Sequence, residues 1–306
     1  METLAPDSAL EVVVVPSSHD LGDNFTVRRV LPSRQLRMVG PFVFLDEMGP
    51  HLFTGGKGLD VRPHPHIGLA TVTYLFSGEI LHRDSVGSVQ AIQPGDVNWM
   101  TAGRGIVHSE RSAPEVRAHD STLSGLQCWV ALPQAQEECA PSFVHTGVAA
   151  LPFVEADGVA ARIVAGTFLG QTSPVATLSP LFFVDLHLQA GAWVDLAADY
   201  TERAAYIVDG ELDLGDDGVY AAGQLLVLKP GRAISVKATG AGARVAYLGG
   251  EPLDGPRYLA WNFVSSSAER IEQAKQDWRD QKFPPVPGET EFIPLPEIPG
   301  KPVRYP

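Results

Sequence analysis

The chain contains little cysteine and few basic residues for its length. Its 306 residues include two cysteines, Cys128 and Cys139, which is too few for the disulfide framework of a small secreted domain. Lysine and arginine number 23 against 36 acidic residues, which gives a net charge of −13. Binding to nucleic-acid phosphates requires a basic patch, so we expect no direct nucleic-acid ligand.

Long hydrophobic runs are also lacking. No stretch reaches the length of apolar residues that crosses a bilayer, so we expect no membrane association. The first residues carry Glu2 and Asp7 and no basic region, and the four valines at 12–15 are too few for a signal peptide. Together with the scarcity of cysteine, this favours a cytoplasmic location.

Strand patterns dominate what the sequence does contain. Short runs rich in β-branched and aromatic residues, such as 71–76 and 181–188, end at glycine or proline turns. Hydrophobic residues make up 44% of the chain, which is long enough for two domains with their own cores. We predict an all-β fold made of two tandem jelly-roll β-barrels.

One helix is expected late in the chain. Ser266 and Glu269 fit a capping box. The apolar stripe that follows at helical spacing consists of Ala268, Ile271, Ala274 and Trp278. This stripe predicts that the helix packs on a barrel, and the proline-rich tail from Phe283 onward is expected to be extended.

The two halves of the chain share a frame of turn glycines. Gly78 corresponds to Gly210, and both precede a glutamate after a hydrophobic strand. The glycines that follow in the same frame form the pairs Gly95 with Gly223 and Gly103 with Gly231. We interpret this repeat as a duplicated barrel.

Two short motifs place candidate metal ligands at strand spacing. Segments 64–66 and 108–110 read His-Pro-His and His-Ser-Glu, and a spacing of two puts both ligand-type residues on one strand face. Three imidazoles and a carboxylate suit Fe, Mn, Co, Ni, Cu or Zn better than Ca or Mg. We predict one divalent transition metal, and its ligands are His64, His66, His108 and Glu110. The histidines at 51, 82, 119, 145 and 187 stand alone in their segments, and we assign none of them to a metal.

The repeat serves as an internal control for this site. In the shared frame, the four candidate ligands correspond to Leu196, Ala198, Val236 and Ala238. The second copy thus lacks ligands at the matching positions and retains the turn glycines. We therefore predict a metal-binding barrel at 1–135, a polar linker at 136–150, and a metal-free barrel at 151–250. Residues 251–306 would form the helix and a tail that pack on the barrels.

The sequence resembles the pirin family, a bicupin branch of the cupin superfamily. The resemblance rests on HPHIGLATVTYLFSGEILHRDS (64–85), PGDVNWMTAGRGIVHSE (94–110) and EPLDGPRYLAWNFVSSSAERIEQAKQDW (251–278). It implies two cupin barrels, of which the first binds one metal, usually iron, through positions that match His64, His66, His108 and Glu110. Many pirins carry a glutamate where this chain has Ala70, and the resemblance implies that this glutamate is not a ligand.

The resemblance implies two classes of function. Some family members resemble quercetin 2,3-dioxygenases, which cleave a flavonol ring with dioxygen, and here Glu110 would be the catalytic base. The candidate pocket residues, from strand position alone, are Trp99, Met100, Gln127 and Trp129, although we slightly favour ordinary core packing for the two tryptophans. Other members act as redox- or metal-sensing partners of transcription factors or metabolic enzymes. The expected metal is Fe(II), with Ni, Mn, Co, Cu or Zn as alternatives, and the expected partners are a flavonol-like substrate with dioxygen, or a protein.

Overall fold

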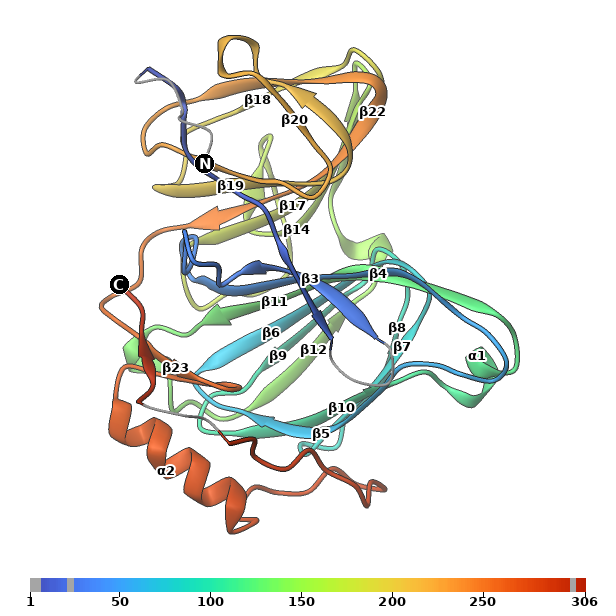
Figure 1. The fold of residues 1–306 in the computed structure, drawn as a ribbon, viewed down its shortest axis with the longest axis vertical. Coiled ribbons are helices and arrows are strands. Elements are labelled where there is room, and N and C mark those ends of the chain that lie inside the picture. The colour runs from blue at the N-terminus through green and yellow to red at the C-terminus, as the bar shows by residue number, and fades with distance from the viewer. Residues whose placement is uncertain (1–6, 21–24, 298–300) are drawn as a thin grey trace. The chain divides into compact units, whose positions relative to one another are not determined.

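The structure, a computed structural model, describes residues 7–20, 25–297 and 301–306 (Figure 1). It consists mainly of β-strands, and α2 (Ala268–Arg279) is the one helix longer than four residues in these ranges. The predicted all-β class with one late helix is confirmed. Within the described residues, no helix is both long enough and apolar enough to span a bilayer.

Two compact units divide the chain, and each combines segments that are distant in sequence. As far as the chain is described, the unit that we name the first barrel comprises 18–28, 44–148 and 253–306. In the same described part of the chain, the second barrel comprises 7–17, 29–43 and 149–252. These units differ from the contiguous ranges expected from the sequence.

One cause of the difference lies near the N-terminus. There β1 (Leu10–Val14) pairs with β21 (Leu225–Leu228) of the second barrel, and local sequence patterns do not reveal such a distant pairing. A second difference falls in the stretch expected to be a linker. Within it, β12 (Ser142–Thr146) pairs with β9 (Val97–Thr101), so this part is a barrel strand.

The first barrel is built from two antiparallel sheets. The smaller sheet has the order β5 (Asp60–His66), β10 (Ile106–Arg111), β7 (Ile80–Asp84) and β8 (Val89–Ile92). The larger sheet has the order β12, β9, β6 (Leu69–Ser77), β11 (Ser121–Ala131), β4 (Phe42–Phe53), β3 (Thr26–Leu31) and β2 (Ser17–Asp20). Side chains of the two sheets meet inside the barrel, because Gln127 of β11 hydrogen-bonds to Glu110 of β10.

The second barrel is a nine-stranded sheet around an apolar core. The main path runs through β1, β21, β19 (Glu202–Asp213), β22 (Ile234–Gly250), β17 (Leu181–Leu188), β14 (Val159–Ala165) and β13 (Phe153–Ala156). Beside this path, β18 (Trp193–Leu196) pairs with β22 and β20 (Val219–Ala221) pairs with β19. The buried core includes Leu186, Ile207 and Val245.

The turn glycines confirm the internal repeat. Gly78 and Gly210 have φ angles of 84° and 78°, and a Cβ at either position would lie within 2.4 Å and 2.0 Å of a backbone carbonyl oxygen. The other pairs share the same left-handed conformation, in which glycine is favoured. The two barrels therefore turn at corresponding points.

Helix α2 packs on the first barrel through the predicted stripe. Ile271, Ala274 and Trp278 are buried in one cluster with residues of that barrel, as expected. The N-cap is Ser267 and not Ser266, because the Ser267 hydroxyl accepts a hydrogen bond from Arg270 N at 3.2 Å. Ser266 is occupied elsewhere, since its hydroxyl donates to Glu137 at 2.8 Å.

Candidate metal centre

Two neighbouring strands of the smaller sheet bring three histidines together. His64 and His66 are two residues apart on β5, so their side chains lie on the same face of the sheet. His108 on β10 is the register partner of His64. Ligand nitrogens of the three side chains all lie within 4.8 Å of one another. The strand spacing of the two motifs therefore predicts this part of the site correctly.

The three imidazoles form a compact, enclosed group. His64 is 8% exposed, and His66 and His108 are each 1% exposed. His66 Nε2 and His108 Nε2 are 3.1 Å apart, close to the roughly 3 Å that separates two nitrogens bound at right angles to one metal at ~2.1 Å. His64 Nδ1 is 2.9 Å from the carbonyl oxygen of Arg62, so Nδ1 donates there and Nε2 is left as the ligand atom.

The surroundings of the three histidines lower the pKa of each imidazole and so favour its neutral, metal-binding form. Burial lowers the pKa of His66 and of His108 well below the ordinary 6.5, and the neighbouring histidines lower each pKa further. Burial also lowers the pKa of His64, against a raising effect from the carbonyl of Arg62 and from Glu110. Neutral imidazoles present lone pairs, and three of them form a donor set suited to a divalent transition metal. The first barrel thus holds a histidine-based metal site.

One ring nitrogen of the cluster lacks a hydrogen bond. His66 Nδ1 is buried and has no hydrogen-bond partner within the described part of the chain. The backbone of Asn262 lies near enough to favour the charged imidazole, but its geometry does not meet that of a hydrogen bond. A buried imidazole with an unsatisfied nitrogen is costly, so packing alone does not account for His66 at this position.

Glu110 lies beside the three-histidine cluster, and its carboxylate is hydrogen-bonded to Gln127. A register shift between His108 and Glu110 changes the pairing of β10 with β5 at this point. Both carboxylate oxygens of Glu110 accept hydrogen bonds from Gln127 Nε2 at 2.9 Å, and Oε1 also accepts from Thr73 at 3.4 Å. The cluster of mutually close ligand atoms contains the histidines without Glu110. Its role as fourth ligand therefore stays a prediction.

The predicted pocket residues divide between the two faces of the larger sheet. Gln127 and Trp129 are register partners of Thr73 and Thr71, so they share the face that meets Glu110. Met100 pairs with Thr71 and lies on this face too, where it packs with Ala102, Ile106 and Phe143.

Trp99 is the exception among the four. It pairs with Val72, which alternates onto the opposite face. The alternation of β9 therefore gives no support to a pocket role for Trp99, and core packing accounts for this side chain.

Trp129 borders the cluster directly. Its ring meets the His66 ring edge to face at 5.2 Å and stacks on Phe44 at 4.0 Å. Its buried Nε1–H has no hydrogen-bond partner among the residues that the structure describes. Trp129 therefore combines an apolar wall with an available donor next to the metal site.

His82 is a site residue that the sequence analysis passed over. On β7 it is the register partner of Glu110, and Asp84 is the partner of His108. His82 Nδ1 lies 3.4 Å from His108 Nδ1, and His82 Nε2 lies 2.9 Å from Asp84 Oδ2. The signal was present in the sequence, because residues 82–84 repeat the spacing of two seen in the ligand pairs.

The C-terminal tail binds the outer side of the ligand strands. Glu289 accepts hydrogen bonds from Ser109 Oγ at 2.8 Å and from Arg111 Nε and Nη2 at 3.1 and 2.8 Å. Ile293 N donates to the carbonyl oxygen of Pro63 at 2.8 Å. Ser109 and Arg111 alternate with the inward-facing His108 and Glu110, so the tail holds the strand that carries the site.

The comparisons with known proteins agree with this geometry. Residues 24–130 match the family model described as Pirin, and residues 183–284 match the Pirin C-terminal cupin domain. The chain belongs to the pirin family. A pirin-like protein of Caulobacter vibrioides is 52% identical over 94% of this chain and 100% of its own length.

Solved structures similar to this pirin include two titled quercetin 2,3-dioxygenase, both from Acinetobacter baumannii. One is 35% identical, with a TM-score of 0.87 over 95% of this chain and 96% of the other. The second is 28% identical, with a TM-score of 0.83 over 90% of this chain and 97% of the other. Both barrels of this pirin therefore have counterparts in those proteins.

Ala70 marks the departure of this chain from the usual pirin motif. It is fully buried on β6, three positions before Thr73, whose side chain contacts Glu110. Strand alternation therefore places Ala70 on the sheet face away from the metal site. Ala70 therefore does not share the sheet face of Thr73, which contacts Glu110.

The corresponding region of the second barrel of this pirin is apolar. Leu196, Val236 and Ala238 are buried as expected, but Ala198 is exposed beyond the end of β18. The strand pairing also shifts the alignment of the two barrels by two residues, because Leu196 pairs with Ile234 and not with Val236. His64 pairs with His108 in the first barrel, and Leu196 pairs with Ile234 in the second.

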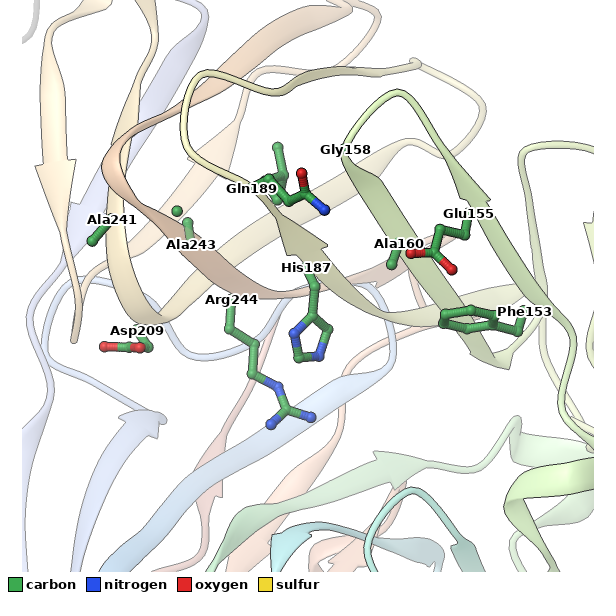
Figure 2. Close-up of a pocket in the computed structure, with 12 residues that line it drawn as sticks. Phe153, Glu155, Gly158, Ala160, His187, Gln189, Asp209, Ala241, Ala243 and Arg244 are labelled. Carbon is green, nitrogen blue, oxygen red and sulfur yellow. The ribbon is translucent and has the colours of Figure 1, made fainter.

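A groove of about 690 Å³ on the second barrel is lined by polar side chains from four strands (Figure 2). Buried Asp185 accepts hydrogen bonds from Arg244 Nε and Nη2 at 2.9 and 2.6 Å, and His187 Nε2 lies 3.4 Å from the same carboxylate. Across the described ranges, the three histidines of the first barrel form the one metal-binding cluster found. Arg244 and His187 of this groove are thus paired with Asp185.

Proposed function

We propose that this chain is an Fe(II)-dependent dioxygenase that cleaves the ring of a flavonol or a similar enolic substrate. The observation that carries the proposal is a buried, neutral histidine triad with a hydrogen-bonded carboxylate, Glu110, beside it. The similarity to structures titled quercetin 2,3-dioxygenase supports the same reaction class. Ni, Mn, Co, Cu and Zn are alternatives to Fe(II), because the ligand type alone does not select among them.

His64, His66 and His108 would hold the metal, with Glu110 as the candidate fourth ligand. The metal would supply a positive charge that favours an ionised substrate hydroxyl, and a redox link between the substrate and dioxygen. The triad leaves coordination positions for small molecules, because three side chains fill only part of the shell of such a metal.

Glu110 is proposed as the base that accepts the proton of the substrate hydroxyl. Gln127 fixes both carboxylate oxygens, and Thr73 contacts one of them, so the base keeps its orientation in the barrel. Gln127 is proposed to hold this base, and Trp129 to offer its Nε1–H to a substrate oxygen. A positioned general base contributes about 100-fold or more to a rate.

The test measures dioxygen uptake and quercetin loss by protein loaded with Fe(II) under anaerobic conditions. Wild type is expected to consume one dioxygen per flavonol. His108→Ala should lose both the metal and the activity, and Glu110→Gln should lose about 100-fold in rate. His187→Ala, a histidine variant on the second barrel, is the matched control with unchanged rate. Equal slow loss of quercetin in all samples would refute the proposal.

A second candidate is a redox- or metal-sensing protein that binds a partner protein. The observation in its favour is the second barrel, whose counterpart of the ligand region is a packed apolar core with no chemistry of its own. Capture from cell extract with the Fe(II) and Fe(III) forms, each compared with His108→Ala, tests it. A partner retained in one oxidation state supports sensing, and no state-dependent partner contradicts it.

A further inference from the structure

Asp84 is the fixed end of a hydrogen-bond chain that leads to the metal site. Its side chain is fully buried. Oδ1 accepts hydrogen bonds from the backbone N–H groups of Val86 and Ser88 at 3.0 and 2.9 Å. Those two bonds fix the carboxylate orientation, so Oδ2 faces His82 Nε2 at 2.9 Å.

The chain then runs from His82 to a metal ligand. A carboxylate can only accept, so His82 Nε2 carries a hydrogen. In the neutral ring, Nδ1 is then an acceptor, and it lies 3.4 Å from His108 Nδ1. With His82 neutral, the hydrogen between these two nitrogens sits on His108 Nδ1, which leaves the lone pair of His108 Nε2 free.

The free nitrogen is the one that faces the other ligands. His108 Nε2 lies 3.1 Å from His66 Nε2 inside the cluster. Both ring nitrogens of His82 are engaged elsewhere, and its side chain lies outside the group of mutually close ligand atoms. The side chain of His82 therefore reaches the three-histidine cluster through its contact with His108 Nδ1. Its ring also stacks on Phe143 at 4.3 Å and 14°, which holds the plane of the imidazole.

We propose that His82 and Asp84 form a positioning pair that sets the tautomer and ring orientation of His108 for metal binding. The proposal rests on the histidine metal site and is independent of the reaction proposed above. Hydrogen-bonded groups behind a ligand typically change metal affinity by about 10- to 100-fold when they are removed.

Asp84→Asn is the decisive substitution because it keeps the shape of the side chain. The amide oxygen would stay with the N–H groups of Val86 and Ser88, so the NH₂ group would face His82 Nε2. His82 Nε2 would then have to accept, Nδ1 would become the donor, and His108 Nδ1 would become the acceptor. The hydrogen of His108 would move to Nε2, where it competes with the metal.

Two further variants separate this role from packing. His82→Phe keeps the ring that stacks on Phe143 and removes both nitrogens. Asp96→Asn is the matched control in the same barrel, because Asp96 also accepts backbone N–H bonds, from Gln93 and Val148, and lies near a histidine, His145. Asp96 has no bond to a ligand histidine.

The experiment measures the zinc dissociation constant by chelator competition and the histidine tautomers by ¹⁵N NMR of the zinc-loaded protein. Asp84→Asn and His82→Phe are each expected to weaken zinc binding about 10- to 100-fold, with Asp96→Asn like wild type. Wild-type spectra should show His108 protonated at Nδ1. Wild-type affinity in either Asp84→Asn or His82→Phe, or a wild-type His108 protonated at Nε2, would overturn the proposal. Because the readout is zinc binding, a failed dioxygenase test leaves it standing.

Discussion

The two barrels carry different side chains on a corresponding pair of strands, histidines in the first and apolar residues in the second. In the first barrel, β5 and β10 pair His64 with His108, and in the second, β18 and β22 pair Leu196 with Ile234. All four side chains are buried. The second barrel thus closes around apolar residues at the point where the first barrel places the histidines of its metal site.

The strands themselves differ in a related way. β22 runs unbroken over Ile234–Gly250, and its counterpart region in the first barrel is divided into β10 and β11. A register shift on β10 lies between His108 and Glu110. Shifts of this kind re-aim side chains next to functional sites, and here the shift accompanies the contact of Glu110 with Gln127.

The largest effect is expected when a ligand of the first barrel is replaced by the apolar residue type found in the second. His66→Leu should weaken metal binding by more than about 100-fold, since it removes a ligand. The same variant should raise the free energy of unfolding of the metal-free protein by about 1 kcal/mol, because it removes an unsatisfied buried nitrogen. Chelator competition and urea denaturation measure the two effects. A metal-free variant less stable than wild type would show that the histidine is part of the core.

The second barrel allows the converse test. Asp185→Asn should destabilise the protein by about 2 kcal/mol at neutral pH and leave metal affinity unchanged. Burial acts to raise the pKa of the Asp185 carboxyl, but hydrogen bonds from His187 and Arg244 prevail and lower it to about 2.

The pH dependence of that variant has a defined sign. Since the folded pKa of Asp185 lies below the ordinary 3.8, its contribution is complete above pH 3.8 and is lost as the pH falls toward 2. The difference in unfolding free energy between wild type and Asp185→Asn should therefore shrink over this range. A constant difference would assign the loss to packing.

A smaller effect concerns the metal-free first barrel at mildly acidic pH. The folded pKa of His66 lies well below 6.5, so below this value the unfolded chain binds more protons and stability falls with falling pH. Wild type should lose about 1.2 kcal/mol more than His66→Leu between pH 6 and 5. Urea denaturation of both metal-free proteins at several pH values measures this slope, and parallel slopes would contradict the neutral state of the buried imidazole.

Much of the fold and the histidine triad could be predicted from the sequence, because both depend on short-range spacing. Strand alternation alone places His64 and His66 on one face, and the turn glycines mark the repeat. Partners distant in sequence could not be predicted in this way. The pairing of β1 with β21, the bond from Gln127 to Glu110, and the position of His82 behind His108 all depend on tertiary contacts.

Two errors of the sequence interpretation have a common physical cause. Ser266 and Ser267 are both suitable N-caps, and the choice falls on Ser267 because Glu137 binds Ser266. Likewise, the repeat frame cannot reveal that β18 ends at Leu196, which leaves Ala198 exposed. In each case the local pattern permits more than one end point for the helix or strand, and contacts with residues distant in sequence select one of them.

The hydrogen bonds between the C-terminal tail and strands β5 and β10 have a consequence for biosynthesis. Glu289 and Ile293 are translated after the entire second barrel, yet they bind the strands that carry the histidines. A nascent chain folds as its segments emerge from the ribosome. The hydrogen bonds from the tail to the ligand strands can therefore form only after the second barrel has been synthesised. The hydrogen bonds on the outer side of the ligand strands are thus completed only after nearly all of the chain has been synthesised.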